Sequence, residues 1–239
     1  MPLSKRQRAE LERQIAEALA EAWAGRADDV LAALGNPPDF ARLPPELWAQ
    51  FDAETRAAVE PILIAARLRS AEQLARSAGV SGAVNWGLIN EHAAAAARRY
   101  TFDLVRGITD TTRTALRQKV AAFAETPAQD LKTLGEEIGR VFGPVRGEMI
   151  ATTEVTRAAV QGTQDLIAEI RSMDPQAQVV DVWRTSNDEL VCPVCAPLNG
   201  VRRSGGVFRH PDGTSHDAPP AHPRCRCDVA TEIVTSLEA

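Results

Sequence analysis

The stretch WGLINEHAAAAARRYTFDLVRGITDTTRTALRQKV, residues 86–120, decides the fold class. Its apolar residues recur by threes and fours, so they fall mostly on one face of a helix. These residues are Ile89, Ala93, Ala97, Tyr100, Leu104, Ile108, Ala115 and Val120. Asn85, just before the stretch, is a residue type favoured at a helix N-cap. We therefore expect a long amphipathic helix whose apolar face packs in a core or against another helix.

The same helical spacing of apolar residues recurs over most of the chain. It occurs in residues 11–22, 47–78, 131–141 and 145–170. Ser4 and Gln7 have the spacing of a capping box before the first of these segments. Thr126, Pro127 and Gln129 together indicate the start of the third segment. The abundance of alanine and an aromatic share of only 5% also favour helices over a sandwich or a barrel.

The pattern changes after residue 175. Residues 179–183 predict a strand, because three valines and a tryptophan are concentrated there, and residues 225–234 predict a closing strand. Residues 198–223 between them are rich in Gly, Pro, Asp, His and Arg, which predicts loops with a hairpin through residues 201–208. We therefore expect a mainly α protein of the α+β class. Its long amphipathic helices are followed by a small, loop-rich β unit that is similar to a zinc knuckle.

Composition and charge exclude several classes of protein. The net charge is −5 and the pI is about 5.5, which argues against a chain that binds duplex DNA with its whole surface. The first six residues carry positive charge without an apolar run behind them, so no signal peptide is expected. No stretch approaches the ~20 apolar residues of a membrane span. We expect a protein made in a reducing cytoplasm, without a membrane partner.

The strongest chemical signal is the pair of cysteine motifs Cys192-Pro193-Val194-Cys195 and Cys225-Arg226-Cys227. A C-x-x-C turn lets two thiolates converge on one ion at ~2.3 Å, as a tetrahedral zinc site requires. Cys225 and Cys227 are two residues apart, so on a strand they would lie on one face. We expect Cys192, Cys195 and Cys225 to bind a structural Zn²⁺. The fourth ligand is Cys227 or His222. The preference for Cys227 is slight, because it would lie on the strand face of Cys225 and because thiolate is the better zinc donor.

A metal would also supply stability that the β unit lacks. A loop-rich unit of this size buries little apolar surface, whereas a structural zinc site contributes on the order of 10 kcal/mol of folding free energy. The alternatives for the four cysteines are two disulfides or four free buried thiols.

Signals for catalysis are weak. His210, Asp212, His216, Asp217 and His222 lie in one short segment and could surround an open catalytic zinc. The thiolates already fill four positions, however, and no H-E-x-x-H or H-x-E motif is present. The sequence also lacks G-x-S-x-G and phosphate-binding motifs. We expect a protein that is not an enzyme.

Several arginines surround the cysteine motifs. They are Arg202, Arg203, Arg209, Arg224 and Arg226. One interpretation assigns Arg224 and Arg226 to contact with nucleic acid. The other makes these arginines solvated loop charges that pair with Asp181, Asp188 and Asp228.

Three groups of residues in the second half of the chain carry a family resemblance. The first is the helical run IATTEVTRA at 150–158. The second comprises Trp183, Asp188, Cys192-x-x-Cys195, Leu198 and Gly200. The third is the closing run PPAHPRCRC at 219–227. In this order they resemble the phage Mu F-like minor head proteins, also called the phage head-morphogenesis family. The resemblance covers roughly residues 100–235 and divides the chain into a helical region, 1–100, and a Mu F-like domain, 101–239, with the zinc knuckle at 179–235.

The resemblance implies a minor capsid protein at the portal vertex of a tailed phage or prophage, acting in head assembly and in DNA packaging or ejection. Its partners would be the portal protein, other capsid or scaffold proteins and the packaged double-stranded DNA. Its location would be the capsid interior near the portal, after assembly in the host cytoplasm. Some family members have arginine and histidine in place of the C-x-x-C cysteines, so zinc is inferred from this sequence itself. The helices of residues 1–100 would suit docking to portal or capsid proteins. The alternative function is a zinc-stabilised DNA-binding accessory protein of the phage head.

Overall fold

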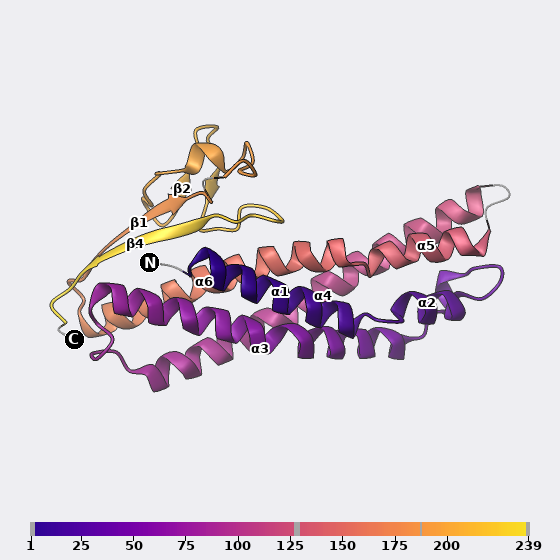
Figure 1. Cartoon of the computed structure of the whole chain (residues 1–239), viewed down its shortest axis with the longest axis horizontal. Helices are drawn as coiled ribbons and strands as arrows, with labels where there is room; N and C mark the ends of the chain where they lie inside the picture. Colours follow the sequence, from indigo (N-terminus) through magenta and orange to yellow (C-terminus); the bar gives the residue numbers. More distant parts are fainter. Residues whose placement is uncertain (1–2, 127–129, 187, 238–239) are drawn as a thin grey trace. The chain divides into compact units, whose positions relative to one another are not determined.

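The computed structural model describes residues 3–126, 130–186 and 188–237 (Figure 1). Its helices are α1 (Lys5–Ala22), α2 (Arg26–Leu34), α3 (Pro45–Ala78), α4 (Trp86–Glu125), α5 (Leu131–Val141) and α6 (Pro144–Met173). Its strands are β1 (Gln178–Arg184), β2 (Phe208–Arg209), β3 (Ser215–His216) and β4 (Asp228–Val234). The predicted class, mainly α with a small C-terminal β region, is confirmed. Among the described residues, no helix has both the length and the apolar character of a membrane span.

Local capping signals located two helix starts correctly. At α1, Ser4 Oγ accepts from Gln7 N at 3.3 Å, and Gln7 Oε1 accepts from Ser4 N at 3.0 Å. These two bonds form the predicted capping box. At α4, Asn85 Oδ1 accepts a hydrogen bond from Leu88 N at 3.1 Å. In each case a side-chain oxygen accepts a hydrogen bond from an amide group at the helix start that has no partner within the helix.

The predicted start of α5 at Thr126 is wrong. The helix begins at Leu131, and its N-cap is Asp130, whose carboxylate accepts from Thr133 N at 2.8 Å. The Thr126 hydroxyl instead donates to Ala122 O at the end of α4. Pro127 and Gln129, which supported the prediction, lie outside the described residues.

Contacts divide the chain into two compact units, each discontinuous in sequence. Unit 1 gathers Met1–Glu12, Ile62–Ala97 and Met149–Ala239, and unit 2 gathers Arg13–Pro61 and Arg98–Glu148. Helices α1, α3, α4 and α6 therefore contribute residues to both units. The predicted division into residues 1–100 and 101–239 rests on the family resemblance, and it stays a prediction.

An aromatic cluster forms the core of unit 2. Trp23 stacks on Phe51 with ring centroids 5.7 Å apart, and Phe142 meets both rings edge-on at 6.4 and 5.8 Å. Trp23 Nε1 donates to Thr55 Oγ1 at 2.9 Å, so the indole is buried without an unpaired donor. The short helix α2 was not predicted. It follows Gly25, whose φ of +77° breaks the chain after α1 without a capping side chain.

In unit 1, α3 and α6 cross at very short range. A Cβ atom on Gly162 would lie 1.9 Å from the carbonyl oxygen of Arg67, so only glycine fits at this crossing. The side chain of Arg67 is buried and forms an ion pair with Asp165, and it donates to Gln161 Oε1 at 3.1 Å. The contact fixes the position of α6, the helix against which the β region packs.

We predict that Gly162→Ala lowers the free energy of unfolding by about 1–3 kcal/mol, because the added methyl overpacks the crossing. The matched control is Gly107→Ala in α4, where nothing lies within 4 Å of the added methyl. That change should raise stability by about 0.5–1 kcal/mol through helix propensity. Urea denaturation of the three proteins measures both changes. Similar effects of the two substitutions would contradict the close approach.

The β region begins directly after α6. Strands β1 and β4 pair antiparallel, with Val182 opposite Ala230, and lie side by side in Figure 1. Asp174, between α6 and β1, accepts hydrogen bonds from Thr235 Oγ1 at 2.7 Å and from Ser236 N at 2.8 Å. These bonds lower the pKa of Asp174 to about 2. The carboxylate therefore holds the end of β4 to the end of α6 at neutral pH.

Two predictions about the β region need correction. The two-stranded hairpin joins β2 to β3 across residues 210–214, while residues 201–207 contribute only isolated bridges, one of which joins Ser204 to Val207. Its turn is closed by Asp212, which accepts from Thr214 N at 2.8 Å. The closing strand begins at Asp228, so Cys225 and Cys227 precede it. Arg224, whose φ is +62°, interrupts an extended path before the cysteines.

Candidate metal centre

A buried tryptophan organises the loops that carry the cysteines. Trp183 on β1 is fully buried, and Phe208 on β2 meets its ring edge-on at 5.2 Å. Val160 on α6 belongs to the same cluster. The other buried members are Cys195, Leu198, Cys225, Cys227 and Val229. Three of the four cysteines are therefore packed in this small core.

Two tight turns with the same hydrogen bond present the candidate ligands. In the first, Cys195 N donates to Cys192 O at 3.1 Å, and in the second, Cys225 N donates to His222 O at 3.1 Å. His222 Nδ1 lies 2.7 Å from Pro223 O. A proton donated from Nδ1 to that carbonyl leaves the Nε2 lone pair available to a metal ion.

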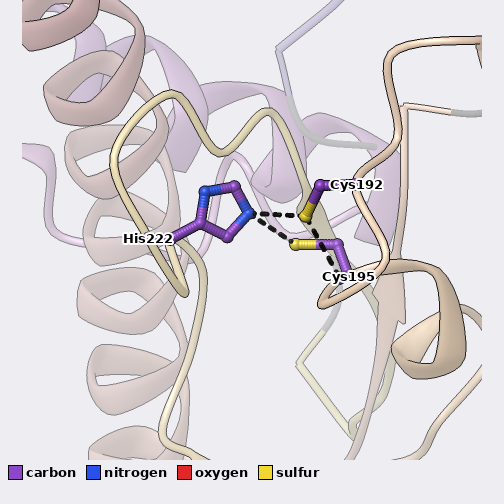
Figure 2. A group of neighbouring side chains, drawn as sticks. All are labelled: Cys192, Cys195 and His222. Atoms are coloured by element: carbon purple, nitrogen blue, oxygen red, sulfur yellow. Dashed lines mark hydrogen bonds between the residues drawn. The ribbon is translucent and has the colours of Figure 1, made fainter.

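Five donor groups converge at these turns. Figure 2 shows that the ring of His222 directs Nε2 at two sulfur atoms, Cys192 Sγ at 2.9 Å and Cys195 Sγ at 3.1 Å. Cys195 Sγ also lies 3.7 Å from Cys225 Sγ. The donor atoms form two overlapping groups, each with all atoms within 4.8 Å of one another. The groups are Cys192, Cys195 and His222, and Cys195, Cys225 and Cys227.

The donor set fits a metal ion. Bonds of 2.3 Å at tetrahedral angles place two sulfurs about 3.8 Å apart, close to the 3.7 Å between Cys195 and Cys225. All five donor residues line a hollow of about 20 Å³, which is room for one particle of the size of water. All four cysteines are free thiols, so the alternative of two disulfides is not what the structure contains. These residues could hold a metal ion.

The electrostatics of the thiols also favour a cation. A hydrogen bond from Cys195 lowers the pKa of the Cys225 thiol, and the same bond raises the pKa of the Cys195 thiol. The pKa of His222 is raised, because the Pro223 carbonyl and the nearby thiolates outweigh the effect of burial. Without a cation, the buried thiols share protons instead of ionising together. A divalent ion would allow all ligating thiolates to carry charge.

Arg8 on α1 anchors the chain that carries the last two cysteines. Its guanidinium donates to Cys227 O at 3.2 Å, to Thr156 Oγ1 at 3.0 Å and to Asp228 Oδ2 at 2.9 Å. Thr156 Oγ1 donates in turn to Cys225 O at 2.9 Å. Burial raises the pKa of Asp228 to about 6, and the charge of Arg8 opposes that rise. Arg8 therefore connects α1, α6 and the start of β4.

The role of Arg8 was not predicted from the sequence, although its position in the helix indicated that it is buried. Arg8 precedes Leu11 by three positions and Ile15 by seven, so it lies on the buried face of α1. An arginine in such a stripe needs acceptors inside the fold. The sequence did not show which acceptors these were, because they lie about 150 and 220 positions further along.

We predict that Arg8→Lys lowers the free energy of unfolding by roughly 3 kcal/mol, because lysine cannot reach all three buried acceptors. Arg13→Lys is the matched control. Arg13 pairs with Glu17 on the exposed surface, so its replacement should cost less than about 0.5 kcal/mol. Denaturant unfolding monitored by tryptophan fluorescence gives both values. Equal stabilities of the two variants would show that Arg8 does not anchor the site.

The remaining predicted site residues contribute no atoms to the two donor groups, although Arg224 and Arg226 line the same hollow. Arg226 forms two hydrogen bonds of 2.7 Å with the carboxylate of Asp188, while Arg224 is exposed and its backbone N–H donates to Thr153 Oγ1. His210 pairs with Asp212, and His216 packs against the Trp183 ring. Within residues 3–126, 130–186 and 188–237, the donor groups that could hold a metal do not include His210, His216, Asp212 or Asp217.

Comparisons with known proteins add no relative. No family model matches the chain, no curated protein is significantly similar to it, and no solved structure matches it.

Proposed function

We propose that the centre binds one structural Zn²⁺ ion, and that the chain is a non-enzymatic minor head protein of a tailed phage or prophage. In this role it would associate with the portal vertex inside the capsid and act in head assembly and in DNA packaging or ejection. The observation that carries the zinc proposal is the convergence of four thiols and one imidazole on a hollow of about 20 Å³.

The donor chemistry supports zinc over harder ions. Thiolates and imidazole select zinc and other soft metals, whereas magnesium and calcium prefer oxygen ligands. Zinc, when bound, would supply a charged cross-link between the turn at 192–195 and the turn at 222–225. The protein's own groups hold these turns in place. Trp183 packs in one cluster with Cys195 and Cys225. Thr156 donates to Cys225 O in the second turn, and Arg8 donates to Cys227 O just after it.

Contacts between the family-type motifs support the assembly proposal. The helical run 150–158 and the closing run 219–227 are distant in sequence, yet they touch at two points. Thr156 Oγ1 donates to Cys225 O, and Thr153 Oγ1 accepts from Arg224 N. The residues that carry the resemblance thus act together as one packing unit. Such contacts are expected of motifs that serve to pack the fold and not to catalyse a reaction.

The DNA-binding alternative receives less support from the geometry. The bidentate ion pair with Asp188 occupies the guanidinium of Arg226, which makes it a poor phosphate ligand. Arg224 is the exposed member of the pair. If the chain binds DNA through this region, Arg224→Ala should weaken binding and reduce its dependence on salt.

We predict that protein purified without chelator contains about one equivalent of zinc, measured by elemental analysis. Cys192→Ser should lower this content strongly, because it removes a ligand that is only half-buried and leaves the core packing intact. Val194→Ser is the matched control, since it changes an exposed residue of the same turn without removing a donor. Wild-type protein that contains less than about half an equivalent of zinc would contradict the zinc proposal.

Removal of the metal should destabilise the β region, since a structural zinc site contributes on the order of 10 kcal/mol of folding free energy. A chelator should therefore lower the melting temperature of the wild type.

For the assembly role, we predict a stable complex of low stoichiometry with the portal protein encoded in the same gene cluster. Co-expression, pull-down and size-exclusion chromatography of the full chain test it, with a portal protein from an unrelated cluster as control. The full chain is needed, because residues before 100 belong to both units and cannot be deleted without disrupting them. No complex in zinc-containing buffer at modest salt would favour the DNA-binding alternative.

A further inference from the structure

The centre has five donors, whereas a tetrahedral ion accepts four. We propose that Cys192, Cys195, His222 and Cys225 are the ligands, and that Cys227 is a reserve thiol that joins Cys195 in a disulfide on oxidation and releases the metal. This inference rests on the proposed zinc site and describes its regulation.

The two matched turns support this choice of ligands. Each turn spans four residues and closes with the same 3.1 Å hydrogen bond, so each presents a donor at its first and last position. The pairs are Cys192 with Cys195 and His222 with Cys225. Across the turns, His222 Nε2 lies 3.1 Å from Cys195 Sγ, and Cys225 Sγ lies 3.7 Å from it. Cys227 follows the second turn and is not part of it.

Cys227 is held by apolar packing as well as by its place beside the centre. It is almost fully buried and belongs to the same core cluster as Trp183 and Val229. This packing gives Cys227 a place in the core without a bond to the metal.

The same thiol is placed for disulfide formation. Cys227 Sγ lies within 4.8 Å of Cys195 Sγ, and both residues are almost fully buried. A disulfide needs an S–S distance of about 2.05 Å, which a small shift of the turn at 192–195 would provide. Cys195 is the only donor common to both groups, so its loss as a thiolate would remove the ligand that links the two halves of the centre.

The oxidant is a peroxide. The Cys195 thiolate attacks hydrogen peroxide, which yields a sulfenic acid and hydroxide. The Cys227 thiol gives its proton to that hydroxide, its sulfur attacks the sulfenic sulfur, the S–S bond forms and hydroxide leaves. In total, two thiols and one hydrogen peroxide give one disulfide and two waters. The new bond would connect the turn at 192–195 to the start of β4, so the β region keeps a cross-link after the ion departs.

The test compares wild type, Cys227→Ser and Cys225→Ser, each as the full chain loaded with Co²⁺ or Zn²⁺. The intensity of the sulfur-to-cobalt charge-transfer band reports the number of bound thiolates. We expect three thiolates in the wild type, no change in Cys227→Ser and the loss of one third of the band in Cys225→Ser. On treatment with hydrogen peroxide, a chromogenic chelator should detect zinc release from the wild type, at least about fivefold faster than from Cys227→Ser. Peptide mapping should find the Cys195–Cys227 disulfide.

Three results would overturn the proposal: a four-thiolate cobalt spectrum in the wild type, zinc loss from Cys227→Ser before oxidation, or equal release rates in both proteins. The wild-type spectrum decides the ligand count even if Cys227→Ser does not fold. A wild type that binds neither metal would instead overturn the zinc site itself.

Discussion

Buried carbonyl groups need hydrogen-bond donors, and this need determines how the second half of this protein folds. The residues that carry the last two cysteines precede β4, so their carbonyl oxygens lie outside its ladder. A buried carbonyl without a donor costs about as much as a lost hydrogen bond. Arg8 and Thr156 provide the missing donors, to Cys227 O and Cys225 O. The path of this loop, and with it the position of the sulfur atoms, therefore depends on two helices that are far from it in sequence.

The sequence allowed prediction of the elements that carry their own start signals. The capping box at Ser4 and the N-cap at Asn85 each act within one helical turn, so they could be recognised locally. The helix start at Asp130 was missed because the prediction took Thr126 as the N-cap. Only the structure shows that the Thr126 hydroxyl turns back to α4. The separate helix α2 had no signal other than Gly25.

The candidate site was predicted in composition but not in detail. The spacing of the cysteines indicated metal ligands, and the structure brings those residues and His222 together. The choice between Cys227 and His222 depended on an assumed strand that would place Cys225 and Cys227 on one face. That strand begins only at Asp228, so the strand-face reason for the slight preference for Cys227 does not hold. Distances between residues some 30 positions apart are properties of the tertiary fold, and no local pattern contains them.

The ion pair between Arg8 and Asp228 also has a consequence for the order of synthesis. Its partners are separated by 220 positions, and ribosomes add about 5–20 residues per second. The first turns of α1 therefore wait roughly 10–45 s on the ribosome before the carboxylate and carbonyl groups that bind Arg8 exist. During that interval Arg8 lacks the acceptors that it has in the folded protein. The first two turns of α1 should thus reach their full resistance to proteolysis only after residues 227–228 have been made and have folded.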